Sequence, residues 1–173
     1  MQMNKRKKKY VILYISLLVA FILQTTLFKR ISVFGVAPSL ILVFVICFSN
    51  SNDIVPSAVF SAIAGLLIDI SGGRIIGFNA MLMMYLSLGI VYIGSEFFRD
   101  TPRATVMLVA IGTFIYELVF FIFNFVIFGN SHFFYMIYRV ILVEIIYNSI
   151  IAIPVNMFVQ KFLKIRSGHS LLD

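Results

Sequence analysis

The sequence has few charged residues, one cysteine and two histidines. Charged residues make up 12% of the chain, roughly half of what a soluble domain uses to cover its surface. The single Cys47 excludes a disulfide framework, and we expect it to be a small buried hydrophobe. The two histidines, His132 and His169, are too isolated to form a convincing metal site.

Sequence motifs of the common enzyme classes are also missing. Gly72 and Gly77 have the outer spacing of a phosphate-binding loop, but Phe78 stands where that loop needs lysine. The chain has no His-Glu-x-x-His pattern, no serine elbow and no paired cysteine and histidine. We therefore predict a protein that is not an enzyme and that needs no cofactor and no metal.

Apolar residues, by contrast, make up 61% of the chain. Because a helix of about 20 residues crosses a hydrocarbon layer about 30 Å thick, long apolar runs predict membrane spans. Six such runs cover residues 10–28, 31–48, 54–70, 75–98, 104–128 and 133–163. They predict an all-α membrane protein with one six-helix transmembrane domain over residues 10–163, between a basic N-terminus (1–9) and a polar tail (164–173). The second run is interrupted by Gly35 and Pro38, so it either crosses with a kink or dips in and returns.

The net charge of +7 comes from basic residues at the ends of the apolar runs. This placement is typical of the cytoplasmic flanks of membrane helices and argues against nucleic-acid binding. Six crossings put ten Lys and Arg residues inside and three outside, whereas five crossings leave six against seven. We therefore predict six spans with both termini in the cytoplasm. The first run is longer than the apolar part of a signal peptide, so we expect it to be retained.

The third run carries a stripe of small and polar residues, Ser57, Ser61, Gly65 and Asp69, at every fourth position. Small residues at this spacing let a neighbouring helix of the same chain or of a partner approach closely. Asp69 ends its helix, where the helix dipole disfavours a negative charge. We expect Asp69 to pair with Arg74 or to cap the start of the fourth helix, unless it belongs to a partner site on the outer face.

Away from the basic end at Lys161, the last two runs contain three charged residues: Glu117, Arg139 and Glu144. A charge inside the bilayer costs about 2.5–3.5 kcal/mol, so each requires a partner. Arg139 and Glu144 point in different directions around one helix, whereas Glu144 and Asn148 share a face. We expect Glu117 and Glu144 to meet Arg139, or amide and hydroxyl donors, inside the bundle. An ion or proton path and a partner-binding surface stay open as alternatives.

Several short motifs resemble those of the MreD family of rod shape-determining membrane proteins. They are Pro38 at the opening of the second helix, Gly65-Leu66-Leu67-Ile68-Asp69, Gly77-Phe78-Asn79-Ala80, and Asn148 with Pro154 in the last helix. The resemblance covers nearly the whole chain in length and layout. One departure is Ser39, because the family often has aspartate after the proline.

The resemblance implies a bundle similar to the substrate-binding subunits of energy-coupling-factor transporters. It implies a non-catalytic scaffold of the cell-wall elongation machinery in the bacterial cytoplasmic membrane. The implied partner is the single-span protein MreC, and through it MreB, the RodA glycosyltransferase and a class B penicillin-binding transpeptidase. The candidate residues for partner binding or a structural polar network are Gly65, Asp69, Arg74, Gly77, Glu117, Arg139, Glu144 and Asn148.

Two other functions remain open from the sequence. A vitamin-binding subunit of a transporter predicts a closed pocket lined by residues such as Tyr85, Tyr92, Asn124 and Glu144. A proton-coupled carrier would be built on Glu117 and Glu144.

Overall fold

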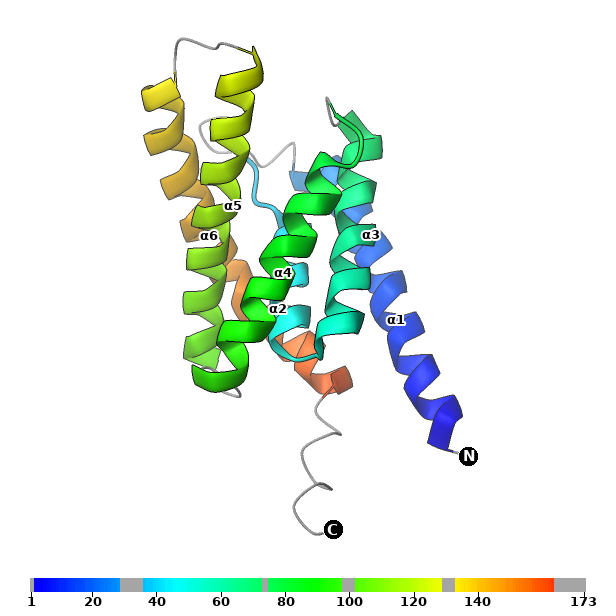
Figure 1. The fold of residues 1–173 in the computed structure, drawn as a ribbon. Coiled ribbons are helices and arrows are strands. Elements are labelled where there is room, and N and C mark those ends of the chain that lie inside the picture. Colours follow the sequence, from blue (N-terminus) through cyan, green and yellow to red (C-terminus); the bar gives the residue numbers. More distant parts are fainter. Residues whose placement is uncertain (1, 29–35, 73–74, 98–101, 129–132, 164–173) are drawn as a thin grey trace.

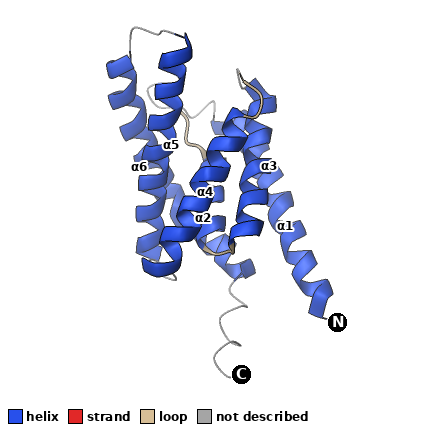
Figure 2. Cartoon of the chain, in the orientation of Figure 1, coloured by secondary structure: helices blue, strands red, loops and turns tan. Residues whose placement is uncertain are grey.

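The computed structural model describes residues 2–28, 36–72, 75–97, 102–128 and 133–163. Helices make up nearly all of this part of the chain (Figure 2). The elements are α1 (Gln2–Leu23), the π-helical turn η1 (Gln24–Phe28), α2 (Leu40–Asn50), α3 (Ile54–Gly72), α4 (Phe78–Phe97), α5 (Pro102–Phe128) and α6 (Phe133–Leu163). Each of the six predicted apolar runs corresponds to one α-helix, so the all-helical fold class is confirmed.

Three helical segments are long and apolar enough to cross a membrane: Ile54–Gly72, Arg103–Phe123 and Val140–Phe162. Shorter apolar segments lie at Tyr10–Thr26, Leu40–Asn50 and Phe78–Gly94. The helix α1 begins at Gln2 and so includes the basic block, because lysine and arginine are good helix formers.

The short helix α2 lies at the centre of the molecule. Every residue from Ile41 to Asn50 is buried, and α2 contacts all five other α-helices. Its 11 residues span about 16 Å, roughly half of a hydrocarbon layer. Pro38 lacks the N–H that a helix interior needs, so the helix starts only after it. An extended segment at 36–39 leads into α2 (Figure 1).

Two helical hairpins, α3–α4 and α5–α6, pack around α2. The contacts within each hairpin are more extensive than those between other helices, while α1 lies at one edge (Figure 1). The predicted stripe on α3 is confirmed, since Ser57, Ser61, Gly65 and Asp69 are all buried. The extensive α3–α4 contacts place this stripe against a helix of the same chain.

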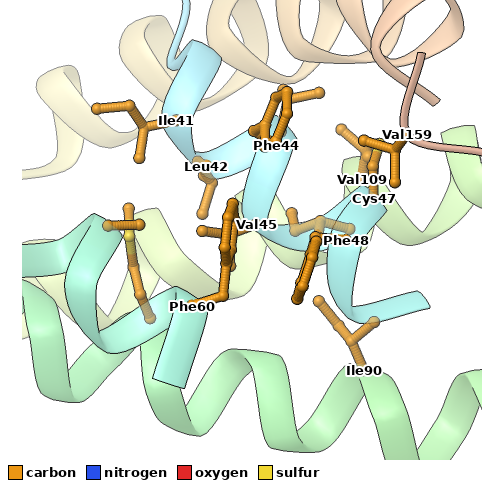
Figure 3. Packing of buried hydrophobic residues seen from close by; sticks show 14 of the residues in the cluster. Ile41, Leu42, Phe44, Val45, Cys47, Phe48, Phe60, Ile90, Val109 and Val159 are labelled. Carbon is orange, nitrogen blue, oxygen red and sulfur yellow. The ribbon is translucent and has the colours of Figure 1, made fainter. Parts of the chain in front are cut away.

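The hydrophobic core lies between α2 and its neighbours (Figure 3). The ring of Phe48 on α2 stacks on that of Phe60 on α3, with centroids 4.0 Å apart. The ring of Phe44, also on α2, stacks against that of Phe60 as well, with centroids 5.9 Å apart. Large apolar side chains also cover the outside, such as Val55, Ile150 and Ile153. An apolar exterior over an apolar core suits a protein whose solvent is lipid.

We predict that Phe60→Ala destabilises the bundle strongly. The Phe60 side chain is fully buried, so the substitution removes its ring contacts and leaves a cavity. Buried phenylalanine truncations cost about 3–5 kcal/mol. Thermal unfolding of the purified protein should show a large loss for Phe60→Ala and a small one for Val59→Ala, whose side chain is exposed on the same helix. Equal losses for the two variants would contradict the assigned core.

Candidate functional site

The carboxylate of Asp69, near the end of α3, is buried against the start of α4. Its Oδ2 atom accepts hydrogen bonds from the backbone N–H groups of Gly77 (2.9 Å) and Ala80 (3.2 Å). Its Oδ1 atom accepts from the backbone N–H (3.2 Å) and the side-chain amide (2.8 Å) of Asn79. The first N–H groups of a helix have no partner within the helix, and a negative charge is favoured there. Asp69 therefore caps α4 from the preceding helix.

Two glycines make this capping geometry accessible. Gly77 has a φ of +93°, a left-handed backbone conformation that side-chain-bearing residues rarely adopt. Gly65 packs directly against the first turn of α4, because a Cβ atom there would collide with the Cα of Ala80. The Gly-Leu-Leu-Ile-Asp segment (65–69) and the Gly-Phe-Asn-Ala segment (77–80) thus pack against each other where α3 meets the start of α4.

A third helix joins this network through Tyr116 on α5. The Tyr116 hydroxyl donates a hydrogen bond of 2.6 Å to Oδ1 of Asn79, whose amide group holds Asp69. We define the Asp69 network as Asp69, Gly77, Asn79, Ala80 and Tyr116. Of the two structural roles predicted for Asp69, the cap on the fourth helix is confirmed. Its predicted partner Arg74 lies outside the described residues.

A second network surrounds Asn148 on α6. Its side-chain oxygen accepts from the backbone N–H of Ser39 (3.0 Å), just before α2 begins. Its side-chain amide donates to the hydroxyl of Thr113 on α5 (3.2 Å) and to a carboxyl oxygen of Glu144 (3.5 Å). Asn148 thereby ties α6 to α5 and to the start of α2. Ser39, Thr113, Glu117, Glu144 and Asn148 form what we call the Asn148 network.

The two buried glutamates meet each other. Glu117 on α5 and Glu144 on α6 are both buried in the bundle, close enough to interact electrostatically. An amide donor was expected for Glu144, and the structure supplies one from Asn148. This donor lies on the same helix as Glu144 and not on another helix. Arg139 belongs to α6, but its side chain lies outside the described part of the structure.

Further polar contacts at both ends of α2 were not anticipated from the sequence. The side-chain oxygen of Gln24 accepts from the backbone N–H of Ile41 at 2.9 Å. At the other end, Ser49 shares a hydrogen bond of 2.8 Å with Ser87 on α4, and Asn50 donates to Thr105 on α5 at 3.3 Å. A lone amide such as Gln24 inside an apolar run is the signal that could have pointed to a buried partner.

The structure does not bring the expected lining residues of a vitamin-binding pocket together. Tyr85 and Tyr92 on α4 are 61% and 76% exposed on the outer surface, whereas Glu144 is only 6% exposed inside the bundle. These residues cannot line one closed pocket, since they face opposite environments. The side chain of Asn124, the fourth expected lining residue, lies outside the described part.

The geometry of both networks is suited to holding helices together. The Asp69 network joins α3, α4 and α5, and the Asn148 network joins α2, α5 and α6. Among the described residues, no group of three or more His, Cys, Asp or Glu side chains is placed to hold a metal ion. Interhelical hydrogen bonds inside a membrane bundle contribute about 0.6–2 kcal/mol each.

Comparison with known proteins identifies one family. Residues 4–166 match the family described as rod shape-determining protein MreD. Searches of the curated proteins and of the solved structures gave no match. The expected similarity to substrate-binding subunits of energy-coupling-factor transporters therefore stays a prediction.

We predict that Gly65→Ala disrupts the α3–α4 hairpin. The added methyl group would collide with the backbone of Ala80, which a side-chain rotation cannot relieve. The matched control is Gly89→Ala on α4, where a Cβ atom meets nothing within 4 Å. Thermal unfolding should show that Gly65→Ala lowers the free energy of unfolding by about 1–3 kcal/mol and that Gly89→Ala does not lower it. A Gly65→Ala protein as stable as the wild type would contradict the close contact.

Proposed function

Since the chain belongs to the MreD family of rod shape-determining proteins, we propose that it is a non-catalytic membrane scaffold of the cell-wall elongation machinery. In this role it binds an MreC-like single-span protein and supports peptidoglycan synthesis. Through that partner it is linked to MreB, the RodA glycosyltransferase and a class B penicillin-binding transpeptidase. The observation that carries the proposal is the family match across residues 4–166.

The proposed topology is a multi-pass protein of the bacterial cytoplasmic membrane, with six crossings and both termini in the cytoplasm. Three segments long enough to span and three shorter apolar helices support it. Successive helices run in opposite directions, and α6 ends at the end of the bundle where α1 begins (Figure 1). The extended segment before α2 adds length to that short helix. The distribution of basic residues, ten against three, supports this orientation.

The two polar networks support a structural role for the interior of the bundle. Asp69 is bonded to backbone and side-chain donors, and Asn148 to a backbone N–H, a hydroxyl and a carboxyl group. Side chains whose polar atoms are bonded within the bundle hold its helices in place. A scaffold that binds other proteins requires such a rigid interior. The outer surface of the bundle is then the part that is free to meet lipid and partner proteins.

We predict that depletion of this protein from its rod-shaped host converts rods into spheres. A scaffold of wall elongation is needed for growth of the lateral wall. Cells that lose it therefore cannot extend along one axis and become round. The measurement is cell width and length by microscopy during depletion, with wild-type protein supplied from a plasmid as the control. An epitope-tagged MreC-like protein should co-purify with the wild-type chain. Depleted cells that keep their width and length would overturn the proposal.

A further inference from the structure

Five consecutive basic residues, Lys-Arg-Lys-Lys-Lys at 5–9, belong to the helix at the edge of the bundle. We call these residues the basic block. They lie within α1, which continues without a break into the apolar part of the same helix. Because successive residues are about 100° apart around a helix, five consecutive positions surround it. A basic position therefore lies on every side of α1, including the sides turned away from the bundle.

The contacts of Tyr10 fix the depth at which the basic block begins. The Tyr10 hydroxyl donates a hydrogen bond of 3.3 Å to the side-chain oxygen of Asn52, in the turn between α2 and α3. Its ring lies edge-on to that of Phe48, with centroids 6.5 Å apart. The block therefore starts level with the polar end of the core. Its five residues add about 7.5 Å of helix, which is close to the roughly 5–7 Å of headgroups on each side of a bilayer.

The outward side of α1 is apolar up to the start of the basic block. Leu13 and Leu17 are buried against the bundle, whereas Val11, Ile15 and Ile22 are exposed. In a membrane protein, such an exposed apolar side is surrounded by lipid chains. The headgroups of the same lipids then lie beside residues 5–9. The basic block is thus placed where lipid headgroups are already present.

The sequence supplies no counter-charge close to the basic block. The first acidic residue of the chain is Asp53, so α1 has none. Lys5 and Lys9 are four positions apart, a spacing at which like charges destabilise a helix. In addition, α5 begins and α6 ends at the end of the bundle where α1 begins (Figure 1), and they carry the exposed residues Arg103 and Lys161. An anionic ligand would reduce the repulsion among these positive charges.

We propose that the basic block binds the phosphate groups of anionic phospholipids and gathers these lipids around the end of the bundle where α1 begins. Lysine and arginine are both phosphate-binding side chains. Each one placed near a membrane surface adds to the attraction for anionic lipid. A zwitterionic headgroup has the same phosphate beside a cationic group, so its net attraction to the block is weaker. The block therefore selects lipids by charge.

The placement of the basic block favours lipid over an acidic protein as the occupant. Its positions surround α1, whereas one bound protein would cover only one side of the helix. Lipid headgroups meet every outward side of α1 at the depth that Tyr10 sets. The inference needs no protein partner and holds for either orientation of the chain in the membrane. Its failure would therefore leave the proposed scaffold function untouched.

Quenching of tryptophan fluorescence by brominated lipid measures which lipids surround the basic block. The chain contains no tryptophan, so a single introduced tryptophan is the only reporter. Val11→Trp places it on the exposed side of α1 next to the block. The matched control, Val126→Trp, places it at an exposed position near the other end of the bundle, beside a turn without Lys or Arg. The full chain is reconstituted in phosphatidylcholine vesicles in which a minor fraction of the lipid is brominated phosphatidylglycerol or, for comparison, brominated phosphatidylcholine.

At low salt, we expect brominated phosphatidylglycerol to quench Val11→Trp about twofold more than brominated phosphatidylcholine does, and the two lipids to quench Val126→Trp equally. Salt at about 1 M, where charges are screened beyond about 3 Å, should remove the preference without any change to the block. Replacing all five residues of the block with glutamine should remove it as well.

Equal quenching of Val11→Trp by the two lipids at low salt would overturn the inference and leave the basic block as a topology signal or a site for an acidic protein. The same preference at Val126→Trp would overturn the location. A preference that survives both high salt and the five substitutions would overturn the proposed cause, because charge on the block would not produce it.

Discussion

The structure depends on satisfying the polar ends of helices that begin inside an apolar body. Water is absent there, so the first N–H groups of each helix require partners from the protein. Side chains from other helices supply them: Asp69 of α3 caps α4, while Gln24 and Asn148 serve the start of α2. Each cap is also a contact between elements. The same bonds that complete a helix therefore decide which helix lies beside it.

This constraint links the MreD-like motifs to the proposed scaffold function. Gly65, Asp69 and Gly77 lie together where α3 meets the start of α4. Gly65 permits the close approach of the two helices, and Gly77 adopts the left-handed backbone that lets its N–H bond to the Asp69 carboxylate. These contacts fix α4 in the bundle with its outer face toward the surroundings. A bundle with apolar sides and a fixed interior suits the proposed role of a membrane scaffold.

Much of this arrangement is predictable from residue spacing, and the rest depends on tertiary contacts. The stripe from Ser57 to Asp69 follows from helical periodicity, and the short α2 follows from Pro38. The bond from Tyr116 to Asn79 is not predictable in this way, because it joins residues 37 positions apart on two helices whose relative placement no local pattern encodes. The contact of Gln24 is not predictable for the same reason: a single amide in an apolar run indicates a buried partner without identifying it.

Backbone hydrogen exchange at the start of α4 tests the central claim most directly. In wild-type protein held in lipid nanodiscs, the amides of Gly77, Asn79 and Ala80 should exchange slowly. In Asp69→Asn an amide group replaces one accepting oxygen, so the backbone amides that this oxygen serves, either Gly77 and Ala80 or Asn79, should exchange at least about tenfold faster, as expected for a lost hydrogen bond. The amide of Met83, one turn further on, should change less. Unchanged exchange at all three positions would contradict the account that Asp69 completes α4 and fixes the hairpin.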